Sequence, residues 1–385
     1  MSGPATGRGE LPAEVAAWIG RPRYEETAEI AVEAGAVGNA LAAAENGNPL
    51  FWDAAVAAVL TGGPVAPPTT LSTWFRPHHW APGRVGPRLP LQVHFDLKDR
   101  LSLPEAVIAD YGITFHRPLR LGEVVATRQV LRSVSDEKTT RLGTGRFWSI
   151  DIEVTGTGGA LAGVETYTGF GYRRPQGAPA PAAGGAGAGE GPGGADHRVA
   201  GSGLAGLGGG PITAAAVGTG RSRQPGGTQP WLLHGDVLVG QVLAEVHHDV
   251  TATTVVLGAL ASRDWRPMHH DRAFAQERNG TRDIFLNTPT QAAWFERLVT
   301  DWTGPHGRLG RLRFAMHRSV FPGDAMVLSG RVTGTSADER GCGWAHLAMA
   351  LTVDGRACTT GEASVALPID AADNPWARAG EDWVP

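Results

Sequence analysis

The amino-acid sequence predicts an α+β protein in which one unit, a long helix followed by antiparallel strands, occurs twice. Three observations lead to this prediction. A glycine-rich segment divides the chain, the same landmark residues recur in the same order on either side of it, and each side has one helix pattern followed by strand patterns. A chain of 385 residues is long enough for two domains, each with its own core.

The glycine-rich segment separates the two copies. Of the 54 glycines in the chain, 18 lie between residues 175 and 227, together with many alanines and prolines and few aromatic residues. Such a segment buries too little apolar surface to offset the entropy lost on ordering. We therefore predict a flexible linker over 175–229, between a first domain over 11–174 and a second over 230–370.

The landmarks on both sides of this segment keep nearly constant spacing, as an internal duplication would leave them. They pair as Trp18-Ile19-Gly20 with Leu238-Val239-Gly240, Asn48-Pro49 with Arg266-Pro267, Thr70 and Trp74-Phe75 with Thr290 and Trp294-Phe295, His116-Arg117 with His317-Arg318, and Gly122-Glu123 with Gly323-Asp324. The first copy is longer, because 47 positions separate Phe75 from Gly122 whereas 28 separate Phe295 from Gly323. We expect a loop or lid over the additional residues, around 76–111.

Each copy also carries helix and strand patterns. Behind a Thr-Pro pair, apolar residues recur at helical spacing and predict a buried central helix over 289–299. Alternating apolar residues between turn residues predict antiparallel strands over 325–332, 344–353 and 357–367 in the second copy, and over 124–131, 147–154 and 160–172 in the first. One helix followed by such strands indicates a sheet that wraps around the helix.

Composition excludes several classes of protein. A formal net charge of -4 gives nucleic acid no electrostatic reason to bind. The two cysteines, Cys342 and Cys358, cannot staple so large a fold, so we expect buried thiols in a reducing compartment. The N-terminal residues lack the basic and apolar blocks of a signal peptide, and no apolar run is long enough to span a bilayer. We expect a soluble, cytoplasmic protein without a membrane partner.

The second copy contains the residues most suited to chemistry. Residues 262–271 read Ser-Arg-Asp-Trp-Arg-Pro-Met-His-His-Asp and gather acid and imidazole groups in a short turn before the central helix. This stretch resembles the signature Gly-Asp-x-Asn-Pro-x-His-x-Asp of R-specific (type 2) enoyl-CoA hydratases and MaoC-like dehydratases. Asp264 falls on the family's catalytic Asp and His269 on its catalytic His, and residues 321–324 resemble its strand-entry motif. The resemblance implies a tandem (double) hot-dog fold whose repeats pack as an intramolecular pseudo-dimer, with a homodimer as a further option.

Three positions depart from the family pattern. Arg263 stands where the family has Gly, Arg266 where it has Asn, and Asn287 near a Gly at the start of the central helix. In the first repeat, Asn46 replaces the acid and Phe51 replaces the imidazole. We therefore expect the first repeat to be catalytically degenerate and to lie on the acyl-tail side.

The resemblance implies a hydratase or dehydratase that adds or removes water across the double bond of a 2-enoyl thioester. The substrate would be an acyl-CoA or acyl-carrier thioester, with no further cofactor. This reaction needs a base for the water, a proton for the α-carbon and a donor to the thioester oxygen. By the resemblance, His269 is the base, Asp264 positions the water and returns the proton, and a backbone N–H near Asn287 or Thr288 stabilises the oxyanion.

Other side chains of the motif have two interpretations each. Trp265 would line the acyl pocket, or it would be an ordinary core residue. Arg263 and Arg266 would face a substrate carboxylate or a phosphate of coenzyme A, or would be solvated surface charges. Asp264 could instead cap a turn, and His269 could be a buried structural histidine.

Two other functions stay open. The departures favour a non-catalytic acyl-thioester-binding subunit, and the fold would also suit a thioesterase, although the central helix offers no carboxylate before Glu296. We expect no metal site, because residues 269–271 hold two histidines and an aspartate but no further ligand. The deciding observation is whether Asp264 and His269 face the same cavity as the backbone of Asn287.

Overall fold

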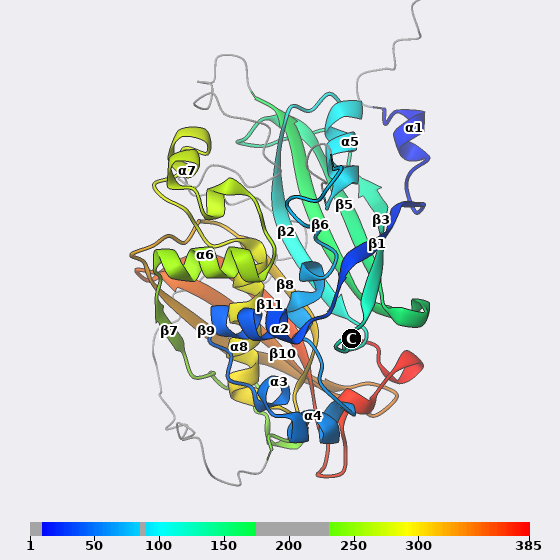
Figure 1. Ribbon diagram of the computed structural model, residues 1–385, viewed down its shortest axis with the longest axis vertical. Coiled ribbons are helices and arrows are strands. Elements are labelled where there is room, and N and C mark those ends of the chain that lie inside the picture. The colour runs from blue at the N-terminus through cyan, green and yellow to red at the C-terminus, as the bar shows by residue number, and fades with distance from the viewer. Residues whose placement is uncertain (1–9, 85–89, 175–230) are drawn as a thin grey trace, which may run out of the picture.

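The computed structural model describes residues 10–84, 90–174 and 231–385 (Figure 1). The predicted linker over 175–229 lies outside the described residues. The two halves of the chain lie edge to edge, and each contributes strands to one curved sheet (Figure 1).

That sheet has eleven strands and is antiparallel throughout. The order is β1-β3-β5-β6-β2-β8-β11-β10-β9-β7, with β4 paired to β5. The strands are β1 (Pro22–Ala31), β2 (Glu105–Phe115), β3 (Val124–Val134), β4 (Lys138–Thr139), β5 (Thr144–Thr155), β6 (Leu161–Arg173), β7 (Val246–Asp249), β8 (Arg308–Met316), β9 (Ala325–Ala337), β10 (Gly343–Val353) and β11 (Arg356–Leu367). The six predicted strands are confirmed as β3, β5, β6, β9, β10 and β11. The halves meet where β2 pairs with β8, with Tyr111 opposite Phe314.

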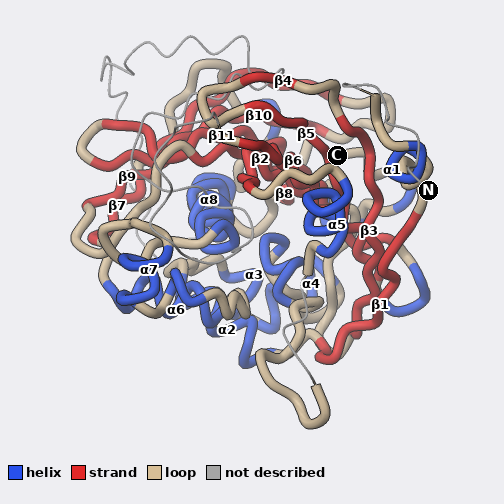
Figure 2. The backbone as a smooth tube through the Cα atoms, turned by 90° about the horizontal axis from the view of Figure 1, so that it is seen from above, coloured by secondary structure: helices blue, strands red, loops and turns tan. Residues whose placement is uncertain are grey.

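The central helix of the second half is α8 (Thr288–Thr303), which confirms and extends the predicted helix over 289–299. Asn287 caps its N-terminus with a side-chain hydrogen bond, and Gly304 follows its last turn with a φ of 67°. Trp294 and Phe295 are fully buried. Figure 2 shows α8 end-on, with the sheet curving around one side of it and α2 (Ala34–Ala43) and α6 (Ala252–Ala261) on the other. The remaining α-helices of the described residues are α1 (Ala13–Ala16), α3 (Pro49–Trp52), α4 (Ala54–Thr61), α5 (Gln92–Arg100) and α7 (Arg272–Arg278).

The first half departs from the second at the equivalent of α8. Only a short 3-10 helix, η1 (Pro68–Thr73), occupies this position. The insertion over 76–111, expected as a loop or lid, starts as a loop but continues into α5 and the beginning of β2. Val93 and Leu97 of α5 are buried in a core cluster that also holds Trp148. This helix is therefore part of a core. The sequence did not indicate this, because polar and aromatic residues are mixed with the apolar ones in the insertion.

Equivalent landmarks of the two halves make the same backbone contacts. The N–H of His116 donates to the carbonyl of Ala162 at 2.9 Å, and the N–H of His317 donates to the carbonyl of Cys358 at 2.7 Å. The first bond joins the end of β2 to β6 and the second joins the end of β8 to β11, so equivalent elements are linked in each half and the structure confirms the duplication.

The residues after 370, beyond the predicted second domain, join the two halves. The indole of Trp383 donates to the carbonyl of Phe115 at 2.6 Å. Arg308 of β8 lies with its guanidinium carbon 3.5 Å from the Trp383 ring centroid and donates to the carbonyl of His116 at 2.9 Å. Burial lowers the pKa of Arg308 to about 9. The tail thus covers the seam between β2 and β8.

Two expectations from composition can be compared with the structure. Cys342 and Cys358 are free and buried, as expected, and burial raises the pKa of each thiol to about 11. Over the described ranges, none of the helices combines the length and the apolar character that a bilayer crossing requires.

Candidate active site

The motif over 262–271 begins in a tight turn at the end of α6. The hydroxyl of Ser262 donates to the carbonyl of Gly258 at 2.8 Å, and the N–H of Asp264 donates to the carbonyl of Ala259 at 2.8 Å. Between them, Arg263 has a φ of 54°, in the left-handed region. Glycine adopts this conformation at no steric cost. This explains why a glycine suits the position, and the turn keeps its shape with arginine in place.

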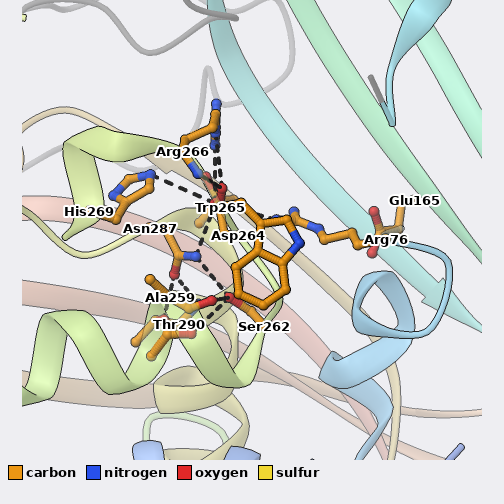
Figure 3. Close-up of polar contacts among 12 residues, drawn as sticks. Arg76, Glu165, Ala259, Ser262, Asp264, Trp265, Arg266, His269, Asn287 and Thr290 are labelled. Carbon is orange, nitrogen blue, oxygen red and sulfur yellow. Dashed lines mark hydrogen bonds and ion pairs between the residues drawn. The ribbon is translucent and has the colours of Figure 1, made fainter. Parts of the chain in front are cut away.

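Asp264 sits at the centre of a cluster of donors (Figure 3). The residue is 3% exposed. Arg266 contacts Oδ1 through Nε at 3.1 Å, Arg76 contacts Oδ2 at 3.3 Å, and Asn287 Nδ2 donates to Oδ2 at 3.0 Å. Burial alone would raise the pKa of Asp264, but the opposing charges of Arg266 and Arg76, together with His269, hold that pKa well below its usual range. Asp264 is therefore a carboxylate at neutral pH.

His269 is fully buried beside Asp264. Its Nδ1 lies 2.8 Å from the carbonyl oxygen of Phe285, which can only accept a hydrogen bond. This contact places the proton of the neutral imidazole on Nδ1 and leaves the lone pair on Nε2. Nε2 lies 3.7 Å from Asp264 Oδ2, so the basic nitrogen and the carboxylate face one another.

Asn287 connects this pair to the central helix. Its Oδ1 accepts the backbone N–H of Thr290 at 3.0 Å, while its Nδ2 donates to Ser262 Oγ at 2.8 Å as well as to Asp264. Thr288 is the first residue of α8, and its hydroxyl lies 3.5 Å from the sulfur of Met316. The positive end of the helix dipole thus lies next to Asp264 and His269.

The three side chains considered for substrate binding all have contacts within the protein. Arg263 Nε donates to the carbonyl of Arg76 at 3.1 Å, and the indole of Trp265 donates to the carbonyl of Pro77 at 3.0 Å. Arg266 is paired with Asp264 as described. Arg263 and Trp265 therefore bind the turn that holds Asp264 to the insertion of the first half.

Two contributors were missed from the sequence. Arg76 belongs to the first half and was noted only as the edge of the insertion, and Ser262 appeared only as the start of the motif. The role of the Asn287 side chain was also missed, because only its backbone was considered. No local pattern marks a side chain whose partner lies in the other half of the chain.

The equivalent turn of the first half keeps the backbone hydrogen bonding of the second but lacks its carboxylate and imidazole. The N–H of Asn48 donates to Asn46 Oδ1 at 3.0 Å, just as the N–H of Arg266 approaches Asp264 Oδ1 at 3.4 Å. Phe51 stands at the position of the imidazole. An amide and a phenyl ring cannot exchange protons near neutral pH.

The side chains of residues 269–271, two histidines and an aspartate, do not point toward a common site. Asp271 caps α7 by accepting the N–H of Phe274 at 3.0 Å, and His270 is exposed while His269 is buried. Over residues 10–84, 90–174 and 231–385, no three side chains of His, Cys, Asp or Glu come together in a way that could hold a metal ion.

The chain is similar to known proteins in sequence and in structure. A family model described as "FAS1-like, dehydratase domain region" matches residues 17–162. The beta subunit of 3-oxo-4,17-pregnadiene-20-carboxyl-CoA hydratase from Mycobacterium tuberculosis (strain ATCC 25618 / H37Rv) is 37% identical over 101 residues, which cover 26% of this chain and 76% of that protein.

Solved structures share the fold over nearly the whole chain. A MaoC-like dehydratase superposes with a TM-score of 0.59 at 16% identity, covering 92% of this chain and 100% of that chain. A MaoC-like dehydratase from Phytophthora capsici gives 0.53 at 12% identity, covering 93% and 99%. A Mycobacterium tuberculosis protein described as having a double hotdog fold gives 0.54 at 15% identity, covering 91% and 96%. With the hydratase subunit, they establish that this chain is a double hot-dog protein and belongs to the MaoC-like family of hot-dog hydratases and dehydratases.

Proposed function

We propose that this chain is a hydro-lyase that adds water to, or removes it from, the double bond of a 2-enoyl thioester. One observation carries the proposal: His269 Nε2 and Asp264 Oδ2 face one another at 3.7 Å, next to the N-terminus of α8. A base, a carboxylate and a helix N-terminus are the three groups that hydration of an enoyl thioester requires.

In the hydration direction, a water held between the two side chains loses a proton to His269 Nε2 as its oxygen bonds to the β-carbon. The electron pair of the double bond moves toward the thioester carbonyl, and the enolate oxygen is stabilised by backbone N–H groups at Asn287 and Thr288. The proton on Nε2 then passes to the α-carbon. Dehydration follows the same steps in reverse.

This scheme changes the part first expected of Asp264. Because Arg76, Arg266 and Asn287 all favour its ionised form, Asp264 is a poor proton donor near neutral pH. We therefore assign the return of the proton to His269 and give Asp264 two other tasks. It orients the water, and it balances the positive charge that develops on the imidazole.

The substrate class rests on the comparisons. The hydratase subunit to which this chain is similar acts, by its name, on a carboxyl-CoA thioester. We propose an acyl-CoA substrate in the cytoplasm, with an acyl-carrier thioester as the alternative, and no further cofactor. Joined through β2 and β8, the two halves would work as an intramolecular pseudo-dimer, with or without a homodimer, and the first half would lie on the acyl-tail side.

The alternatives receive less support. Glu296, the carboxylate that a thioesterase would need on the helix, is buried and accepts the N–H of Thr69 at 3.0 Å, away from the acid–base pair. The similar hydratase is named a beta subunit, so the second candidate is a subunit whose activity depends on a partner. That candidate predicts binding of acyl thioesters without turnover.

The test follows the loss of enoyl-thioester absorbance on mixing the purified chain with crotonyl-, 2-octenoyl-, tiglyl- and mesaconyl-CoA. We expect turnover of at least one thioester, and a fall on the order of 10²–10⁴ in kcat for Asp264→Asn and for His269→Ala. His94→Ala is the matched control, because His94 is equally buried but lies in the first half, beside Trp148. Binding of thioesters without turnover would favour the partner-dependent subunit, and activity that survives both substitutions would reject the mechanism.

A further inference from the structure

We infer that Arg76, supplied by the half that lacks the acid and the imidazole, is a positioning residue for the catalytic carboxylate of Asp264. This inference rests on the proposed function and goes beyond it. The degenerate half would then still take part in catalysis, by completing the site of the other half.

The first observation is the contact itself. Arg76 NH1 lies 3.3 Å from Asp264 Oδ2, and the two side chains are 12% and 2% exposed. Figure 3 shows Arg76 reaching Asp264 from the side opposite His269. Burial opposes the charge on Arg76, but the combined effect of Asp264, Tyr167 and Glu165 exceeds that of burial and raises the pKa of the guanidinium. An ion pair out of water is screened little, so its geometry and charge both matter.

The second observation is that the backbone around Arg76 is held independently of this ion pair. Its carbonyl accepts Arg263 Nε at 3.1 Å, and the next carbonyl, of Pro77, accepts the Trp265 indole at 3.0 Å. Arg263 and Trp265 flank Asp264 in the sequence. The residues on either side of Asp264 therefore hydrogen-bond to the backbone of the loop that carries Arg76. The guanidinium of Arg76 in turn contacts Asp264 itself.

A third observation concerns what lies behind Arg76. Glu165 of β6 is fully buried, and its Oε2 accepts the hydroxyl of Tyr167 at 2.7 Å. The charges of Glu165 and Arg76 act on one another, and Figure 3 shows Glu165 beside Arg76, away from Asp264. Two buried acidic groups thus lie on either side of the guanidinium, and both favour its charged form.

The duplication gives a fourth observation. Arg76 follows Phe75 as Glu296 follows Phe295, so the two residues occupy equivalent positions. Glu296 also crosses the seam between the halves, where its carboxylate accepts the N–H of Thr69 at 3.0 Å. In each half, the side chain at this position therefore contacts the other half. Of the two side chains, only Arg76 contacts a group that we propose acts on the substrate.

Four groups face Asp264. Arg266, His269 and Asn287 approach it from the second half, and Arg76 approaches it from the first. Loss of the Arg76 charge leaves the other three in place. It should raise the pKa of the Asp264 carboxyl, because one of the two guanidinium charges that lower it is gone. It should also free the carboxylate to move relative to His269.

The experiment compares Arg76→Met, Arg76→Lys and Arg297→Met in the full chain, with kcat and KM measured against pH on the enoyl-CoA that the panel identifies. Arg297 is the matched control, because it too contacts the other half of the chain. It donates to the carbonyl of Ala44 at 3.2 Å and to Glu45 at 3.1 Å, beside the degenerate turn and not beside Asp264. We expect Arg76→Met to lower kcat on the order of 10²-fold, with a smaller change in KM, and to move the acid limb of kcat/KM to higher pH. Arg76→Lys keeps the charge and should restore the acid limb while recovering only part of kcat.

A merely structural role would lower the melting temperature of Arg76→Met and leave the pH profile of the folded protein unchanged, and that result would overturn the inference. A carboxyl ¹³C titration, in which Asp264→Asn assigns the Asp264 signal, gives the same answer without activity. An unmoved Asp264 signal in Arg76→Met would reject the role of the charge. If Asp264→Asn and His269→Ala both stay active, the proposed function fails instead, so the two failures are distinguishable.

Discussion

Replacing Asn287 by alanine removes a neutral hydrogen bond to Ser262 Oγ and two interactions that bear directly on the site. Its Oδ1 caps α8 by accepting the N–H of Thr290 at 3.0 Å, and its Nδ2 donates to Asp264 at 3.0 Å. An N-cap contributes about 1 kcal/mol, and a hydrogen bond to a charged group about 1.5–3 kcal/mol. Because Asn287 is only 1% exposed, water does not readily replace either one. From these two interactions alone, we expect Asn287→Ala to lower the free energy of unfolding by roughly 2.5–4 kcal/mol.

Asn287→Ser separates the two contributions. Serine caps a helix as well as asparagine does but is too short to reach Asp264, so this variant should recover about 1 kcal/mol of the loss while turnover stays as low as in the alanine variant. Urea denaturation followed by tryptophan fluorescence at pH 7, alongside enoyl-CoA turnover, measures both. Equal stability of the two variants would refute the capping, and full activity of either would refute the part played by the bond to Asp264.

Two further predictions concern stability at the seam. Burial raises the pKa of Glu296 to about 7, so the folded protein holds this proton after the unfolded chain has lost it. Stability should therefore fall as pH rises from about 4.5 to about 7, by roughly 3 kcal/mol. Glu296→Gln should remove that fall, as seen in urea denaturation at pH 5 and pH 8, and an unchanged pH dependence would contradict this assignment. Trp383→Ala should cost about 3–5 kcal/mol, since it deletes a buried indole that covers Arg308 and bonds the carbonyl of Phe115; thermal unfolding tests this, with exposed Trp52→Ala as the control.

The sequence alone determined the parts of this protein that depend on near neighbours. The central helix and six of the strands followed from apolar periodicity and turn residues, because burial on one face leaves a period of 3.6 or 2 in the chain. The proximity of Asp264 and His269 was also predictable, since the two residues lie five positions apart in one turn. Their 3.7 Å separation follows from that turn closing on itself.

Only the tertiary structure decided which distant residues complete the site. Arg76 and Asp264 are 188 positions apart in the sequence, and they meet because β2 pairs with β8 and places the two halves edge to edge. The C-terminal tail reaches the seam for the same reason, through Trp383. An isolated arginine or tryptophan carries no periodic signal of its partner, because that contact depends on packing between whole repeats and not on the local pattern.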